Sequence, residues 1–249
     1  MISKSQISFV KSLHQKKFRK EYGLFIAEGL KLVTEFLNSD YIIETIFFTA
    51  NASPKLLNLS QNIKLHEVST DDLAKISNLS TPQHVIALVK VPKQTILTSN
   101  SFKSSFSLAL DGIQDPGNLG TIIRTADWFG LKNIICSIDT VEAYNPKVVQ
   151  ATMGSLSRIT VQYTDLSLFL KDTPVPVFGA ALDGESIFKA NFGAEGIIVL
   201  GNEGNGISAE VQKNIKYFIT IPRFGNAESL NVASSAAIFC SELKRNSEK

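Results

Sequence analysis

The second half of the chain contains a series of short, strongly apolar runs, and this feature most constrains its fold. Stretches with helical periodicity separate the runs, which lie at residues 107–113, 133–138, 175–182, 196–201 and 217–222. Strands as apolar as these are typical of a parallel sheet that helices cover on both faces. The pattern therefore predicts an α/β fold with a parallel sheet, a helix at 119–129 and a final helix at 230–243.

The first half also alternates strand and helix patterns, with a more mixed composition. An amphipathic helix is expected at 5–20, and Pro54 is expected to open a short helix. Other elements are predicted as strands at 24–28, 41–49, 64–68 and 85–91, with helices at 30–37 and 71–77. The Ser-, Lys- and Thr-rich stretch at 92–105 indicates a linker. We predict a small α/β domain over 1–91 and a second domain over 106–249.

Composition excludes several classes of protein. A hydrophobic content of 44% with 19% charged residues argues against wholesale disorder. No apolar run reaches the roughly 18 residues of a membrane helix, and residues 1–12 lack the apolar core of a secretory signal. Cys136 and Cys240 are far apart, and His14, His66 and His84 show no paired metal-ligand spacing. We expect a cytoplasmic protein that does not interact with membranes and holds no metal.

The net charge of +2 hides a basic cluster at the start of the chain. The first twenty residues contain six Lys or Arg and no acidic residue. Such density attracts phosphate backbones, which makes Lys16, Lys17, Arg19 and Lys20 candidates for contact with nucleic acid. The alternative is a solvated helix face, and the cluster favours nucleic acid only if the rest of the chain acts on it.

Three loops that follow predicted strands contain unusual concentrations of Gly, Asn and charged residues. In the first, Asp115-Pro116-Gly117 predicts a turn, and a helix is expected to start near Asn118, whose side chain can cap it. Arg124 lies about two helical turns further along. An isolated Arg usually lies on a solvated helix face, but its position behind this tight turn favours a functional role.

The second loop has three glycines in six residues, which lets the backbone approach a ligand closely. Its spacing, Gly201, Gly204 and Gly206, differs from the dinucleotide fingerprint G-x-G-x-x-G, and the chain has no G-x-x-x-x-G-K-[ST] phosphate loop. The third loop turns at Pro222 and Gly225 and then presents a polar run. Packing alone does not explain that run, which reads Glu228, Ser229, Leu230 and Asn231.

Together the three loops resemble the motifs of the SpoU (TrmH-type) RNA ribose 2′-O-methyltransferase family of the SPOUT superfamily. The matching residues are Asn118, Gly120 and Arg124, the run Leu200 to Gly206, the pair Ile221-Pro222 and the run Ser229 to Val232. Their order and spacing match across about 130 residues. The first half resembles the ribosomal-protein-like, RNA substrate-binding domain of that family, with marks at Phe25 to Gly29 and at Thr81-Pro82-Gln83.

The resemblance implies a parallel-sheet methyltransferase domain whose C-terminal part forms a trefoil knot, although knots are rare exceptions among folds. It implies S-adenosylmethionine as cofactor, RNA (rRNA or tRNA) as substrate and a homodimer, and Thr81-Pro82-Gln83 slightly favours rRNA. The catalytic residues that it implies are Arg124, Asn118, Glu203, Ser229 and Asn231. The cofactor-binding residues that it implies are Leu200, Gly201, Gly206, Ile221 and Leu230.

The family usually assigns activation of the ribose hydroxyl to the residue at position 124. A guanidinium stays protonated in proteins and has no acceptor atom, which argues against a literal general base. We therefore predict that Arg124 binds the adjacent phosphate and orients the nucleotide, while a phosphate oxygen or a water takes the proton.

Two other functions compete with this interpretation. A non-catalytic RNA-binding protein on the same scaffold would bind RNA without the cofactor. A nucleotide-dependent oxidoreductase would fit the α/β alternation and a glycine loop, but not the glycine spacing.

Overall fold

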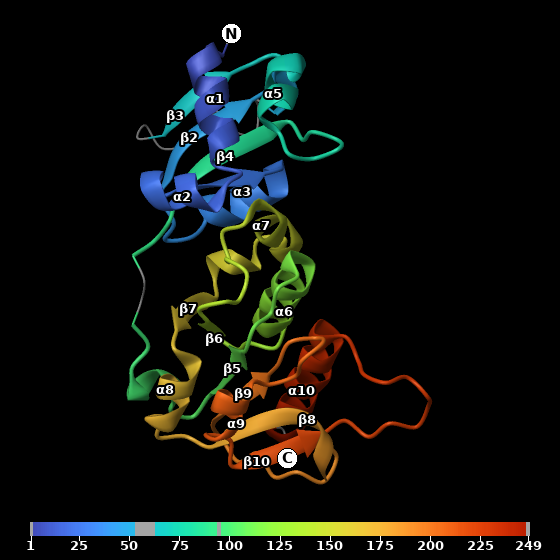
Figure 1. Cartoon of the computed structure of the whole chain (residues 1–249). Helices are drawn as coiled ribbons and strands as arrows, with labels where there is room; N and C mark the ends of the chain where they lie inside the picture. The colour runs from blue at the N-terminus through green and yellow to red at the C-terminus, as the bar shows by residue number, and fades with distance from the viewer. Residues whose placement is uncertain (1, 53–62, 94–95, 248–249) are drawn as a thin grey trace. The chain divides into compact units, whose positions relative to one another are not determined.

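The computed structural model describes residues 2–52, 63–93 and 96–247, which form two compact units (Figure 1). The helix expected from Pro54 lies outside the described residues. The first unit comprises Met1–Lys93 and Glu142–Arg158, and the second comprises Gln94–Val141 and Ile159–Lys249. The segment Glu142–Arg158, which the sequence places in the second domain, thus packs with the first unit.

The first unit is built on a four-stranded mixed sheet in the order β1-β4-β2-β3. Its strands are β1 (Leu24–Glu28), β2 (Ile43–Phe48), β3 (Lys64–Glu67) and β4 (Val85–Lys90). β4 runs antiparallel to both β1 and β2, whereas β3 is parallel to β2. Fully buried side chains such as Val10, Ile26 and Ile86 form its core, so the small α/β domain is confirmed in its essentials.

The helices of this unit are α1 (Lys4–Ser12), α2 (Lys16–Tyr22), α3 (Leu30–Leu37), α5 (Thr70–Ile76) and α7 (Pro146–Thr152). The prediction of one helix over 5–20 is wrong, because the chain breaks between α1 and α2. α1 starts at a capping box in which Ser3 and Gln6 bond each other's backbone. The break lets Leu13 enter the core while α2 starts in a new direction.

Arg19 explains much of this break, and it is not the surface cation that the sequence predicts. Its side chain is only 2% exposed. One guanidinium nitrogen donates to the Leu13 carbonyl at 2.9 Å, and another lies 2.5 Å from a carboxylate oxygen of Glu142. Arg19 therefore joins the α1–α2 break to the segment that carries α7. The prediction that Arg19 contacts RNA is therefore wrong, because a buried, ion-paired guanidinium is not available to a phosphate.

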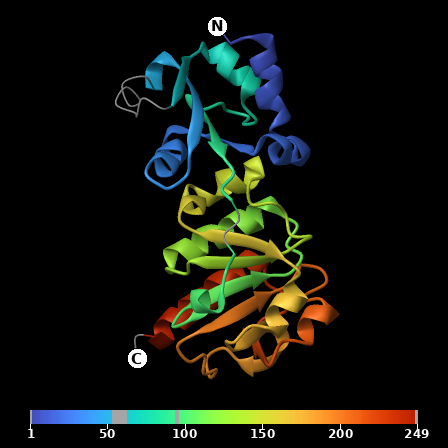
Figure 2. The ribbon, with the colours of Figure 1, turned by 90° about the vertical axis from the view of Figure 1, so that its left-hand side faces the viewer.

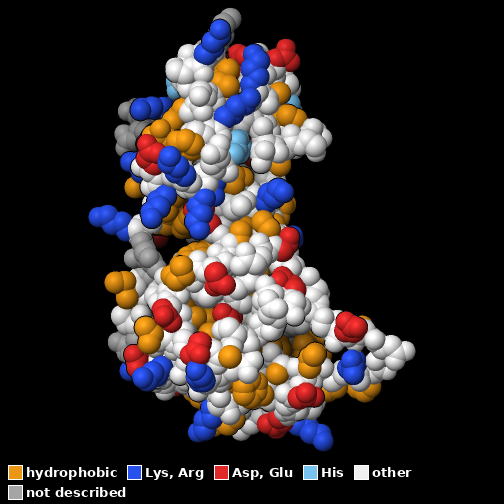
Figure 3. Space-filling view, viewed as in Figure 1, with side chains coloured by type: hydrophobic (Ala, Val, Ile, Leu, Met, Phe, Trp, Pro, Cys, Tyr) orange, Lys and Arg blue, Asp and Glu red, His pale blue; other side chains and the backbone are white. Residues whose placement is uncertain are grey.

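The other basic residues near the start of the chain remain on the surface. Lys16, Lys17 and Lys20 are exposed, and the Lys17 ammonium lies 5.6 Å from the Phe18 ring centroid. Figure 3 shows Lys and Arg side chains gathered over the first unit, around α1 and α2. The basic face thus exists without Arg19.

The second unit contains a six-stranded sheet in the order β10-β8-β9-β5-β6-β7, and every pairing is parallel. Its strands are β5 (Phe106–Leu110), β6 (Asn133–Ser137), β7 (Thr160–Thr164), β8 (Val177–Ser186), β9 (Gly196–Leu200) and β10 (Tyr217–Thr220). The predicted parallel sheet is confirmed. β7 is not predicted from the sequence, because this edge strand is only half-buried and lacks a continuous apolar run.

Helices cover both faces of this sheet (Figure 2). α6 (Pro116–Trp128) packs with α10 (Val232–Ser247) on one face, whereas α8 (Leu166–Lys171) and α9 (Ala209–Gln212) lie on the other. Leu97 and Phe102, from the expected linker, are buried in the core of this unit. Among the described helices, none combines the length and the apolarity that a membrane crossing requires.

Candidate functional site

Three bends of the second unit follow strands of one parallel sheet, so they emerge at the same edge. They lie at 111–118 after β5, at 201–208 after β9 and at 221–231 after β10. Two of the contacts between the first bend and the second come from Asn202 and Ser208. Asn202 donates from Nδ2 to the Gly112 carbonyl at 2.8 Å, and the Ser208 amide donates to Asp111 Oδ2 at 2.7 Å.

Asn118 connects all three bends. Its Nδ2 donates to Glu203 Oε1 at 2.6 Å, and its Oδ1 accepts from Asn231 Nδ2 at 3.0 Å. Asn231 also caps the start of α10, because its Oδ1 accepts the Ala233 amide at 2.9 Å. The structure therefore brings together three of the five predicted catalytic residues, through side chains far apart in the sequence.

The expectation that Asn118 caps the helix is wrong. α6 starts two residues earlier, with Pro116 in its first turn and Asp115 as the cap. Asp115 Oδ1 accepts the Asn118 amide at 2.8 Å, which leaves the Asn118 side chain free for the bonds to the other two bends. An Asp before Pro is the better cap because its carboxylate is favoured at the positive end of a helix.

The glycine bend is held tightly by its own backbone. A Cβ on Gly201 would lie 2.2 Å from the Gly206 carbonyl carbon, and Gly206 has a φ of +68°. Asn202 and Gly206 exchange both backbone hydrogen bonds, at 2.9 Å each. Asn202 Oδ1 also accepts the amides of Gly204 and Asn205. Asn202 is not among the predicted site residues, although an Asn between glycines is the signal that predicts such a turn.

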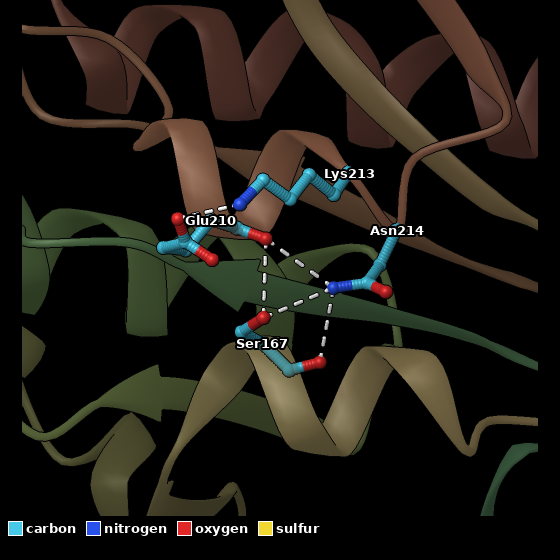
Figure 4. A network of polar contacts seen from close by, with 4 residues as sticks. All are labelled: Ser167, Glu210, Lys213 and Asn214. Carbon is cyan, nitrogen blue, oxygen red and sulfur yellow. Dashed lines mark hydrogen bonds and ion pairs between the residues drawn. The ribbon is translucent and has the colours of Figure 1, made fainter.

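The far end of the glycine bend is anchored on α8 (Figure 4). Asn214, just after α9, donates from Nδ2 to the Ser167 carbonyl at 3.1 Å and to the Glu210 carbonyl at 3.3 Å. Ser167 Oγ donates to the same Glu210 carbonyl at 3.1 Å. This network holds α9 against α8, and it therefore anchors the chain that follows the glycine bend.

A cavity of about 1000 Å³ lies beside these bends. The segment 221–231, which projects from the second unit in Figure 1, contributes to its wall. All five predicted cofactor-binding residues line the cavity: Leu200, Gly201, Gly206, Ile221 and Leu230. Glu203 and Ser229 line it as well, whereas Asn118, Asn231 and Arg124 are not among its lining residues.

Arg124 is exposed on α6, and within the described part of the chain its guanidinium makes no hydrogen bond or ion pair. Six positions along a helix turn a side chain through about 240°. Arg124 therefore does not share the face of α6 from which Asn118 reaches the other bends. It shares a face with Trp128, one turn later, whose side chain is 84% exposed.

The described residues offer neither a metal site nor a reactive thiol. No group of three or more His, Cys, Asp or Glu among them is arranged to hold a metal ion. Burial raises the pKa of the Cys240 thiol to about 12 and raises that of Cys136 as well. Both thiols are therefore protonated near neutral pH and unsuited to nucleophilic attack.

Comparison with known families matches both parts of the chain. The SpoU rRNA Methylase family matches residues 105–241, and the MRM3-like substrate binding domain matches residues 4–87. The 23S rRNA (guanosine(2553)-2'-O)-methyltransferase RlmP of Bacillus subtilis is 33% identical over 238 residues, covering 94% of each chain.

Solved structures agree along the whole length. A chain from Porphyromonas gingivalis, assigned to the TrmH family of RNA methyltransferases, is 39% identical, with a TM-score of 0.89 and coverage of 98% of this chain and 99% of that one. An AdoMet-bound rRNA methyltransferase from Sinorhizobium meliloti is 28% identical, with a TM-score of 0.89 and coverage of 98% and 97%.

Replacing Gly201 with Ala should destabilise the second unit. The new Cβ would collide with the Gly206 backbone, which cannot move without breaking its paired bonds to Asn202. We expect a loss of about 1–3 kcal/mol, the usual cost of overpacking, measured by thermal or urea unfolding. Gly225→Ala is the matched control, because no atom lies within 4 Å of the position that its Cβ would take. Equal unfolding midpoints for the two variants would contradict the packing described for the glycine bend.

Proposed function

The chain belongs to the SpoU rRNA Methylase family, and from this we propose how its own residues carry out the reaction. It transfers a methyl group from S-adenosylmethionine to a ribose 2′-hydroxyl of RNA, with rRNA favoured over tRNA as substrate. The observation that carries the assignment of the site is that two of the bends line one cavity of about 1000 Å³ and that Asn118, in the third bend, joins them.

The cavity suits S-adenosylmethionine in size and in chemistry. Leu200, Ile221 and Leu230 give it apolar walls for a base, and the glycine bend offers backbone groups for polar atoms. Glu203 adds a carboxylate to the same wall. When bound, the cofactor supplies a methyl group that is already electrophilic. The protein must therefore place the ribose oxygen and provide a route for its proton.

We propose that Asn118 acts by positioning. Both ends of its amide are engaged, one with Glu203 and one with Asn231, so it holds these side chains rather than a ligand. Glu203 and Ser229, which line the cavity, are then the polar groups that face the ribose. Holding reacting groups in one geometry can supply roughly 7–11 kcal/mol of rate enhancement.

Arg124 binds the phosphate next to the target ribose in this proposal. Its exposed guanidinium presents N–H donors in a planar fork that matches phosphate oxygens. Because it carries no acceptor, the proton of the hydroxyl passes to a phosphate oxygen or to a water.

We propose that the chain acts as a homodimer in which this face of α6 meets a second copy. Trp128, one helical turn from Arg124, is 84% exposed, and so large an exposed aromatic side chain is typical of an interaction surface. Within one chain, Arg124 does not line the cavity. In the proposed homodimer, the Arg124 of one copy would lie at the cavity of the other. The trefoil knot stays a prediction from the resemblance, and a cytoplasmic location stays a prediction from the composition.

RNA docks by charge on the first unit in this proposal. Lys16, Lys17 and Lys20 are exposed on α2, and their charges contact the RNA backbone without selecting a sequence.

Replacing Arg124 should separate chemistry from cofactor binding. Arg124→Ala should lower methyl transfer by about 10²-fold, the usual cost of a misplaced reacting group, while calorimetric titration with S-adenosylmethionine stays within a few-fold of wild type. Arg124→Lys should restore part of the rate, because an ammonium keeps the charge but loses the fork. Near-normal turnover of the alanine variant would remove Arg124 from the mechanism. RNA binding without cofactor binding by the wild type would favour the non-catalytic alternative.

Placing a charge on the exposed face of α6 should disrupt the dimer. Trp128→Glu would force a carboxylate into the proposed interface, so sedimentation should show a monomer where the wild type is a dimer, and methyl transfer should fall with it. Leu168→Glu, on α8 and 61% exposed in the wild type, is the control and should leave the dimer intact. A monomeric, active wild-type protein would contradict the homodimer.

Neutralising the α2 lysines should weaken RNA binding and reduce its salt dependence. Lys16, Lys17 and Lys20 changed together to Ala should reduce the slope of log K against log salt by up to about 2, since each phosphate contact on single-stranded RNA contributes about 0.7. Filter binding at several salt concentrations measures the slope. The control changes three exposed lysines of the second unit to Ala, namely Lys171, Lys189 and Lys216. An unchanged slope would show that the α2 lysines only solvate the surface.

A further inference from the structure

The first unit contains a cavity of its own, of about 420 Å³, which the reaction described above does not use. It lies at the end of β1, between the loop that follows α5 and the start of α7. Its apolar wall is formed by Ile26, Leu79, Pro146 and Ala151. Glu28 and Lys147 bring opposite charges to it. A space of this size and composition can hold one nucleotide.

Glu28 is the unusual group in this cavity. Only 5% of the residue is exposed, and within the described part of the chain no Lys or Arg forms an ion pair with it. Its side-chain hydrogen bonds to described residues both end on Oε1, which accepts from Ser77 Oγ at 2.5 Å and from the Gln83 amide at 3.3 Å. A buried carboxylate without a cation is costly, and Oε2 can still accept N–H donors.

His14 lines the same cavity but does not neutralise Glu28. Its Nε2 lies 3.3 Å from the Ile76 carbonyl, so this nitrogen carries the proton and donates. Burial lowers the pKa of His14, more strongly than the nearby Glu28 raises it. The ring is therefore neutral near pH 7, so it offers Glu28 no positive charge.

Lys147 gives the cavity a positively charged group as well. It lines the cavity, yet its side chain is exposed, whereas Glu28 is buried. A ligand that satisfies both residues presents N–H donors inward and an anionic group outward, with a flat apolar body between them. A nucleotide has this arrangement, because its base edge carries N–H groups and its phosphate is anionic.

We infer that this cavity binds an unstacked guanine of the RNA, at a nucleotide other than the one that is methylated. This inference rests on the RNA substrate of the proposed function. Guanine presents two neighbouring donors, N1–H and N2–H₂, on the edge that single-stranded RNA exposes to proteins, whereas each other base presents one donor group there. Glu28 accepts from that edge. The walls from Ile26, Leu79 and Pro146 contact the ring, and Lys147 attracts the phosphate.

The test compares four trinucleotides, UGU, UAU, UCU and UUU, as probes titrated against the full-length protein. UGU should bind about tenfold or more tightly than the others, which is the discrimination that one bidentate base contact provides. Glu28→Gln, which keeps an oxygen for Ser77 but adds donors, should abolish the preference. Ala151→Leu, which fills the cavity from α7, should weaken UGU binding by a similar factor. Glu21→Gln, an exposed carboxylate on the same unit, is the matched control.

Titration of each variant with S-adenosylmethionine separates this inference from the proposed function. Cofactor binding by the wild type with no preference for UGU would overturn the guanine cavity alone, whereas absence of cofactor binding would contradict the proposed function. A preference for UGU that survives both Glu28→Gln and Ala151→Leu would also overturn the inference. If Glu28→Gln fails to fold, UGU binding by Ala151→Leu and by Lys147→Ala tests the inference instead. Lys90→Ala is the control for Lys147→Ala. Displacement of UGU by N-acetylarginine amide at equal affinity would assign the cavity to a basic side chain of a protein instead.

Discussion

The paired hydrogen bonds of Asn118 hold together three bends that the chain makes far apart in its sequence. A carboxamide is suited to this position because one planar group offers both a donor and an acceptor. A carboxylate there would repel Glu203, and an aliphatic side chain would leave both partners unbonded. The glycine bend and the projecting loop both line the large cavity, and both are joined through Asn118. The shape of the proposed cofactor site therefore depends on a residue that does not line it.

How much of this site could be predicted depends on how far apart in the sequence the interacting residues lie. Strands such as β5 and β9 are continuous apolar runs, so their pattern alone indicates a parallel sheet. That the five proposed cofactor-binding residues line one cavity could be predicted, because the resemblance names them and they follow strands that end at one edge of the sheet. Two roles have a local signal: the cap at Asp115, an Asp before Pro, and the turn at Asn202, an Asn between glycines. The bond from Asn202 to the Gly112 carbonyl could not be predicted, because its two residues lie 90 positions apart and become neighbours only after folding.

Arg19 shows where reasoning from charge alone fails. Within a run of basic residues nothing distinguishes it from Lys16, Lys17 or Lys20, because its partner Glu142 lies 123 positions away. That partner belongs to a segment between two strands of the second sheet, which nevertheless packs with the first unit. A guanidinium suits the buried position because it can bond the Leu13 carbonyl and the carboxylate together, whereas an ammonium lacks the planar fork. The bond to the Leu13 carbonyl ties α2 to the break between α1 and α2.

The two cavities differ in the kind of free energy that they supply. In the large cavity the proposed polar groups face the reacting ribose, so their removal lowers the rate of the bound complex. In the proposed role of the smaller cavity, a contact at Glu28 is made equally before and during the reaction, and such uniform binding changes KM while kcat stays the same. In the proposed docking of RNA, the exposed lysines of α2 act earlier still, because surface charge affects encounter and is screened by salt. These proposals therefore assign affinity, choice of RNA and chemistry to separate groups of residues, so that each can change without altering the others.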